Sequence, residues 1–186
     1  MTFQPPLSGL EKLFEPQIPL PGHDLRDFPH VPKRALSANA KWIGRAGELL
    51  VESVLLRIGL VSAQLPEFMS ADCIVYHPDA LLRVQIKTCS KPRNGAFHFN
   101  VFKGYHRSPT GVRPYDRSDY DLLALVALSE NVVKFTADRR QTQSFLVADV
   151  PGLRAYPRRS LDDALEGIGL ASCDATTSDT TPTAQY

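Results

Sequence analysis

The stretch Leu81-Leu82-Arg83-Val84-Gln85-Ile86-Lys87-Thr88-Cys89 decides the fold prediction. Between positions 82 and 87 the even residues are apolar and the odd residues are polar, which is typical of a β-strand with one face on a core. Residues two apart in a strand point to the same side, so Gln85 and Lys87 are expected to project side by side, about 7 Å apart. The stretch therefore predicts a strand with an amide and an amine on one face.

A second β-type segment, 71–76, precedes this strand and carries Asp72 near its start, 13 residues before Gln85. The intervening Pro78-Asp79 pair is typical of a turn, so the two segments are expected to form a hairpin. Such a hairpin would bring the Asp72 carboxylate, the Gln85 carbonyl and the Lys87 ammonium together.

A long helix is predicted before the hairpin. Ser37 or Asn39 can cap its start, its apolar residues recur at helical spacing, and Gly59 ends it. Glu48 on this helix is expected to bring a second carboxylate to the site, although it can instead pair with Arg45. The expected buried stripe is Trp42, Ile43, Ala46, Leu49, Leu50, Val54, Leu55 and Ile58.

The remaining pattern favours an α+β fold with a mixed central sheet flanked by helices. A short helix is expected after Ser160, where Asp163 follows in a capping-box-like arrangement. Phe97 and Phe99 are expected in the core. Further β-type segments are predicted at 61–65, 97–102, 121–128, 132–136 and 144–148.

The length of 186 residues suits one domain with appendages, and 43% hydrophobic residues exclude a wholly disordered chain. Residues 1–34 hold seven of the 15 prolines and are predicted to form an extended arm. Residues 35–170 are predicted to fold, and residues 171–186, rich in Thr, Ser, Asp and Ala, are predicted to be a disordered tail.

The composition also bears on the compartment. No apolar run is long enough to span a bilayer, and no secretory leader is visible. The three cysteines are widely spaced and odd in number, so neither a disulfide framework nor a paired zinc site is expected. A reducing, cytoplasmic setting is the expectation.

The net charge is only +1, but residues 83–117 carry eight basic side chains and one acidic one. Such a segment attracts polyanions, of which nucleic acid is the commonest; the alternative is a solvated surface balanced by acidic residues elsewhere. The residues expected to contact nucleic acid are Lys91, Arg93, Lys103, Arg107, Arg113 and Arg117.

The hairpin and helix together predict a site for a hard divalent cation. Mg²⁺, or Mn²⁺ in its place, prefers oxygen ligands at about 2.1 Å. Asp72 offers a charged oxygen, Gln85 a neutral one and Ile86 its main-chain carbonyl, while Glu48 can bind the metal or one of its waters. Lys87 would orient a water and offset charge on a phosphate, as phosphodiester hydrolysis requires.

These motifs resemble the PD-(D/E)XK nuclease superfamily, in particular its branch of group I intron homing endonucleases and Holliday-junction-resolvase-like proteins. The resemblance rests on Gly44–Glu48, Ala71-Asp72 and Val84–Thr88 and covers roughly residues 39–137. It implies a restriction-endonuclease-like core and a divalent-metal-dependent DNA endonuclease. It further implies double-stranded or branched DNA as substrate and a homo-oligomer. The implied catalytic residues are Glu48, Asp72, Gln85 and Lys87.

The chain departs from the family motif at two positions. Ala71 stands where proline is usual, and Gln85 stands where Asp or Glu is usual. A neutral amide holds Mg²⁺ less strongly than a carboxylate does. Two alternatives therefore stay open: a non-catalytic nucleic-acid-binding or assembly module with the nuclease fold, and an enzyme that acts on RNA.

Overall fold

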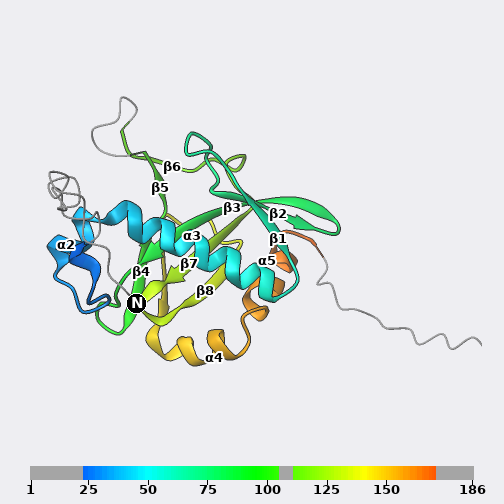
Figure 1. The fold of residues 1–186 in the computed structure, drawn as a ribbon. Coiled ribbons are helices and arrows are strands. Elements are labelled where there is room, and N and C mark those ends of the chain that lie inside the picture. Colours follow the sequence, from blue (N-terminus) through cyan, green and yellow to red (C-terminus); the bar gives the residue numbers. More distant parts are fainter. Residues whose placement is uncertain (1–22, 105–110, 171–186) are drawn as a thin grey trace, which may run out of the picture.

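The computed structural model of the chain describes residues 23–104 and 111–170 (Figure 1). None of the helices in these two ranges is both long enough and apolar enough to cross a membrane. The elements in chain order are η1 His23–Leu25, α2 Lys33–Ala38, α3 Ala40–Arg57, β1 Val61–Gln64, β2 Cys73–His77, β3 Ala80–Cys89, β4 Ala96–Asn100, β5 Phe102–Lys103, β6 Arg113–Pro114, β7 Leu122–Ala127, η2 Leu128–Glu130, β8 Val132–Thr136, β9 Thr142–Leu146, η3 Val147–Asp149, α4 Val150–Ala155 and α5 Arg159–Gly167.

The centre of the fold is a five-stranded sheet with the order β1-β2-β3-β7-β8. β3 and β7 run parallel, with Lys87 opposite Leu125, whereas β1–β2, β2–β3 and β7–β8 are antiparallel. The parallel step arises because the chain leaves the sheet after β3, forms β4–β6 and returns to β7. The prediction of an α+β fold with a mixed central sheet flanked by helices is confirmed.

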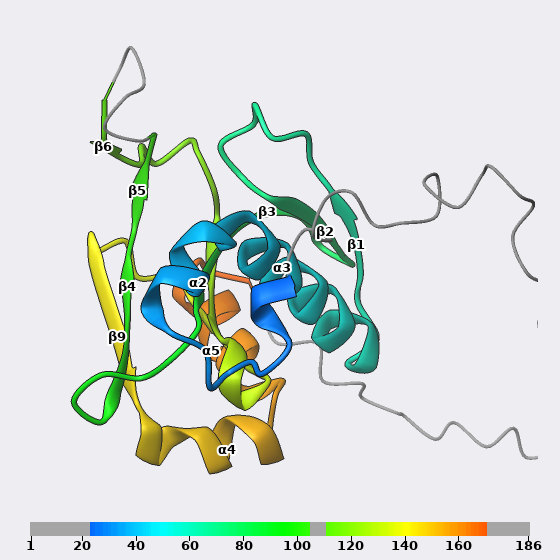
Figure 2. The same ribbon diagram turned by 60° about the vertical axis from the view of Figure 1, so that its left-hand side comes forward.

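Both faces of the sheet are covered, and β7 lies between two cores. Its even residues pack with α3 and α5, and its odd residues pack with the β4–β9 pair. Figure 2 shows β4 and β9 at the left of the view, apart from α3 in its centre. All six residues of β7 are buried, which explains why this strand reads as an uninterrupted apolar run. The predicted core positions Phe97 and Phe99 are confirmed.

The long helix has the predicted bounds, and Gly59 follows its last residues with a φ of +83°. Of the two predicted capping residues, Asn39 is the N-cap of α3 and Ser37 lies within α2. The Asn39 side chain does not cap the helix, because its amide donates backwards to the Ala35 carbonyl at 2.9 Å. The predicted buried stripe is wrong in part, because Trp42, Ala46 and Leu49 are exposed.

Close approach to β3 decides which side of α3 is buried. A side chain at Gly47 would overlap Thr88 Oγ1, so the helix lies against the strand only because position 47 has none. The buried stripe consequently centres on this glycine rather than on the largest residues. Its members are Ile43, Gly47, Val51, Val54 and Leu55.

Ser160 has another role than the one predicted. α5 begins at Arg159, one residue before Ser160, and has no side-chain cap. The buried Ser160 hydroxyl instead accepts a hydrogen bond from the Phe135 backbone N–H at 3.1 Å. It therefore joins α5 to β8.

The seven predicted β-type segments are all present, 132–136 with the predicted ends and the others with shifted ends, whereas α2, α4, β5 and β6 were not predicted. Residues 23–34, assigned to the arm, include a buried Val31, whose carbonyl accepts from Lys91 Nζ at 2.8 Å. The rest of the predicted arm, 1–22, and the predicted tail, 171–186, lie outside the described residues.

Candidate functional site

The backbone of Asp72 is fixed between two strands just before β2 begins. Its N–H donates to the Val84 carbonyl on β3 at 3.0 Å, and its carbonyl accepts from the Leu65 N–H at the end of β1 at 2.8 Å. These bonds extend both ladders of the sheet by one residue. The carboxylate of Asp72 is therefore held against β3 by its own backbone.

The Asp72 side chain contacts two consecutive residues of β3. Its Oδ2 accepts from Gln85 Nε2 at 2.5 Å and from the Ile86 backbone N–H at 2.6 Å. Gln85 Nε2 also donates to the Ile86 carbonyl at 3.2 Å. The structure thus brings Asp72, Gln85 and Ile86 together, and two of the oxygens expected to bind a cation share one N–H₂ group.

Glu48 reaches the same region from α3, one residue after the glycine that packs on Thr88. It lines a cleft of about 540 Å³ together with Asp72, Gln85 and Lys87. Its Oε2 atom accepts from Arg45 Nη1 at 2.8 Å and from Gln64 Nε2 at 3.4 Å. Glu48 therefore stands in the cleft wall and also forms the ion pair with Arg45 foreseen from the sequence.

Lys87 points from β3 toward the β5–β6 pair. Its Nζ donates to Tyr115 Oη at 2.9 Å and to the Phe102 carbonyl at 3.2 Å, and it lies 5.0 Å from the centroid of the Tyr115 ring. Tyr115 is half-buried and packs edge-on against Tyr120. From the sequence, Tyr115 is only one aromatic residue of a basic loop, so its contact with Lys87 could not be predicted.

Burial shifts the acid and the amine of the cleft in opposite directions. Loss of water raises the pKa of Asp72 to about 6, and the charge of Glu48 adds to this, against the Ile86 N–H, Lys87 and Gln85. Burial also lowers the pKa of Lys87, and the nearby Asp72 charge opposes that shift. The cleft thus holds a carboxyl group and an ammonium group whose protonation equilibria are coupled.

The residues expected to contact nucleic acid divide into three kinds. Lys103 Nζ bonds Asp116 at 2.8 Å and Asp119 at 2.5 Å, so its charge is balanced within the segment. Lys91 holds the backbone of Val31. The side chains of Arg93, Arg113 and Arg117 are exposed, and Arg107 lies outside the described residues.

Arg83 is a further member of the basic segment whose charge is balanced. Its Nη2 bonds Asp121 Oδ1 at 2.8 Å, and its Nε bonds the other carboxylate oxygen at 3.1 Å. Residues 83–117 hold eight basic residues and one acidic residue, but this count overstates the positive charge that the segment presents to a polyanion.

Within the described residues, no group of three His, Cys, Asp or Glu side chains is placed to hold a metal. The cleft offers two carboxylates, one amide and one backbone carbonyl instead. This is a set of oxygen donors rather than of nitrogen or sulfur donors, and only a hard cation suits it.

Comparison with known proteins gives a match in structure but not in sequence. No protein-family model and no curated protein matches this chain. A bacterial homing endonuclease, I-Ssp6803I, superposes with a TM-score of 0.53 at 14% identity over 68% of this chain and 97% of the endonuclease. At this identity the likeness concerns the fold. The mixed sheet flanked by helices in this chain therefore has the same fold as that homing endonuclease.

Proposed function

We propose that this protein is a divalent-metal-dependent endonuclease that hydrolyses the phosphodiester bonds of DNA. The observation that carries the proposal is the contact between Asp72, Gln85 and Ile86 in an open cleft that Glu48 and Lys87 also line. The fold shared with a homing endonuclease supports DNA as the substrate.

The cleft residues fit Mg²⁺ by their chemistry. Asp72 Oδ2 and the Ile86 carbonyl both face the partial positive charge of Gln85 Nε2, which is the arrangement that two oxygens adopt around a cation. A half-turn of the Gln85 amide replaces its N–H₂ by Oε1, so the same three residues then offer three oxygens. Asp72, Gln85 and the Ile86 carbonyl would hold the ion, with Glu48 as a further acidic neighbour.

A bound Mg²⁺ supplies Lewis-acid polarisation of the phosphate and a lowered pKa for water. The chain's own residues supply position and charge. Asp72 is fixed by two backbone hydrogen bonds, and Lys87 brings an ammonium group to the same cleft, where it offsets the negative charge of a phosphate. Tyr115 and the Phe102 carbonyl fix the direction of that ammonium.

A second candidate function is a nucleic-acid-binding module without catalysis. Two observations favour it: the Gln85 amide already satisfies Asp72, and Glu48 is paired with Arg45. Under this second hypothesis the cleft need not take up a metal. Calorimetry with Mg²⁺ or Mn²⁺ separates the two, since the proposed nuclease loses its heat of binding when Asp72 is replaced by Asn.

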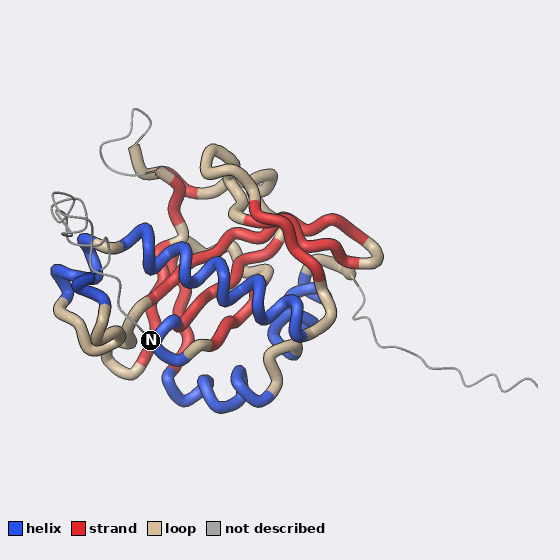
Figure 3. The backbone as a smooth tube through the Cα atoms, in the orientation of Figure 1, coloured by secondary structure: helices blue, strands red, loops and turns tan. Residues whose placement is uncertain are grey.

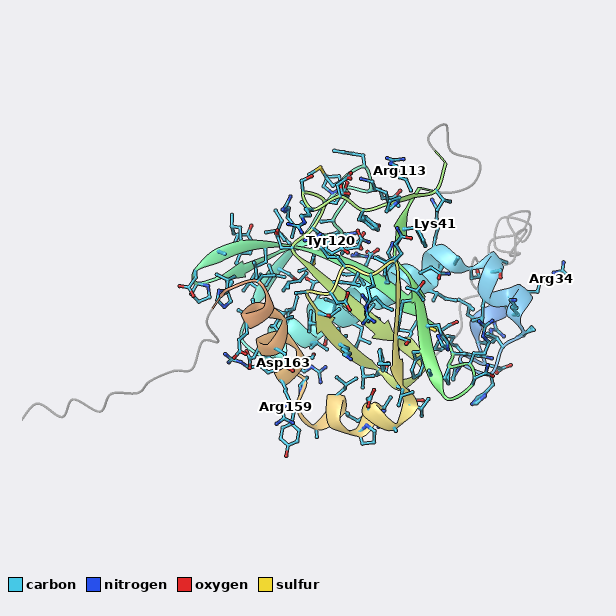
Figure 4. The ribbon with its side chains drawn as sticks, turned by 180° about the vertical axis from the view of Figure 1, so that it is seen from behind. Arg34, Lys41, Arg113, Tyr120, Arg159 and Asp163 are labelled. Carbon is cyan, nitrogen blue, oxygen red and sulfur yellow. The ribbon has the colours of Figure 1, made fainter. Side chains whose placement is uncertain are left out.

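The decisive experiment is cleavage of plasmid, branched DNA and RNA by the purified chain, with Mg²⁺ and with EDTA. The proposal expects DNA cleavage that EDTA abolishes, and a loss of at least about 100-fold in Asp72→Asn and Lys87→Ala. Asp163→Asn and Lys134→Ala are matched controls on α5 and β8; Figure 4 shows Asp163 well away from Lys41 at the start of α3. Full activity of Asp72→Asn would refute the proposal, and preferred cleavage of RNA would reassign the substrate.

A further inference from the structure

The outward side of α3 carries an apolar stripe that the sheet does not use. Trp42, Leu49 and Leu56 recur every seven residues and are 56%, 49% and 54% exposed. Ala46 and Ser53, also exposed, occupy the positions between them at steps of four and three. This spacing is that of a helix that packs along a second helix. These five residues are called the outer seam below.

The outer seam is distinct from the side of α3 that contacts the sheet. At 100° per residue, the buried group around Val51 lies about half a turn from the seam. Figures 1 and 3 show α3 lying across the front of the sheet with its other side outward. The helix therefore has two apolar sides, and only one of them is covered within the described residues.

We propose that the outer seam binds a second copy of this chain through antiparallel pairing of two α3 helices. The sizes of the seam residues are self-complementary in that direction. Trp42 of one copy then lies against Ser53 of the other, and Leu49 lies against Ala46, so each of these layers joins a large side chain with a small one. Leu56 lies beyond them, opposite the start of the other helix at position 39. Parallel pairing would instead set Trp42 against Trp42 and Ala46 against Ala46, with crowding in one layer and a void in the other.

The charges beside the seam agree with antiparallel pairing. Arg45 and Glu52 both flank the seam on the same side, seven residues apart. The two-fold axis of an antiparallel pair brings this side of one helix beside the same side of the other. Arg45, which pairs with Glu48 of its own chain, therefore also approaches Glu52 of the other copy, and opposite charges meet at the rim of an apolar contact.

One consequence of this symmetry concerns the cleft and rests on the proposed function. Glu48 lies on the same flank of α3 as Arg45 and Glu52, and it lines the cleft with Asp72. In an antiparallel pair related by a two-fold axis, this flank of one α3 and the same flank of the other lie on one side of the dimer. Both clefts would then open on one side, where two sites can act on the two strands of one duplex. The pairing itself requires neither metal nor DNA.

The test uses Trp42 as its own reporter, because it is the only tryptophan of the chain. Sedimentation and tryptophan emission of the full-length protein are followed over a dilution series without DNA. The expected result is a dimer at micromolar concentration and an emission that moves to longer wavelength as the dimer dissociates. Leu49→Glu and Ser53→Arg should each raise the dissociation constant more than about tenfold.

Both substitutions lie at exposed positions, so circular dichroism should show that the fold is kept. Leu146→Glu changes an equally exposed leucine on β9 and should leave the dimer intact. A monomer at every concentration overturns the proposal, whatever the emission of Trp42. A dimer that dissociates without a change in that emission, or that persists unaltered in Leu49→Glu, also overturns it. A negative nuclease assay leaves these readouts unaffected.

Discussion

The Asp72 carboxylate accepts a hydrogen bond from the Gln85 amide at 2.5 Å, and the next residue of β3 donates to the same oxygen. A glutamine at position 85 thus satisfies the Asp72 carboxylate by a hydrogen bond when no cation is bound. A carboxylate there would place two negative charges together and would need a cation or a proton between them.

Gln85→Glu should make the chain depend on a metal for its stability. In EDTA the two carboxylates should lower the free energy of unfolding by about 1–3 kcal/mol, since a good hydrogen bond becomes a repulsion. Added Mg²⁺ should reverse this loss and raise the melting temperature of the variant more than that of the wild type. Thermal unfolding with and without Mg²⁺ measures both effects. Gln141→Glu, at an exposed position, is the control; an equal Mg²⁺ response in the two variants would contradict the assignment.

The stability of the metal-free chain should depend on pH through Asp72. Its pKa is about 6 in the fold against 3.8 without burial, so the folded state holds this proton more tightly than the unfolded state. The resulting stabilisation is complete below pH 3.8 and is lost as the pH rises through 6. Asp72→Asn lacks this dependence.

Denaturant unfolding in EDTA from about pH 4 to about pH 7 measures the difference between wild type and Asp72→Asn. The stability of the variant relative to the wild type should increase as the pH rises over this interval. Curves that stay parallel would show that Asp72 titrates near its ordinary value.

Tyr115→Phe should weaken the orientation of the Lys87 ammonium and leave the other cleft residues in place. The substitution keeps the ring beside the ammonium but removes the hydroxyl that accepts from Nζ at 2.9 Å. If the proposed function holds, the cleavage rate should fall by about tenfold with little change in KM, because one charge-assisted hydrogen bond is lost. Tyr76→Phe, an exposed tyrosine on β2, is the control. A purely structural role would instead lower the melting temperature and leave the rate of the folded enzyme unchanged.

Gly47→Ala and Gly44→Ala should change stability in opposite directions. A methyl group at position 47 overlaps Thr88 Oγ1 and pushes α3 from β3, at an expected loss of about 1–3 kcal/mol. A methyl group at position 44 meets nothing within 4 Å, so the better helix former should add up to about 1 kcal/mol. Chemical denaturation compares the two directly, and a neutral Gly47→Ala would show that the helix does not depend on this approach.

Local sequence patterns predicted most of the secondary structure. Alternation identified β3, a proline-containing turn joined it to β2, and Gly59 marked the end of α3. The β5–β6 pair and α2 were missed because each is too short to show a period. The hydroxyl of Ser160 was misassigned because its partner, the backbone of β8, is 25 residues away in sequence.

The site was predictable only where its residues share one hairpin. The order of Asp72, Gln85 and Lys87 along two adjacent strands sufficed to expect them near each other, since register and alternation are local properties. The partners of Lys87 come from β5 and from Tyr115, 28 residues onward, and no spacing rule reaches that far.

The sequence by itself determined the strands, the long helix and the succession of polar residues on the hairpin, because these follow from side-chain period and turn chemistry. The tertiary structure decided which side of α3 is buried, which basic residues are balanced by aspartates, and where the ammonium of Lys87 points. Those outcomes depend on contacts between segments distant in the chain. The helical spacing of apolar and charged residues does not indicate which other segment each side of the helix will pack against.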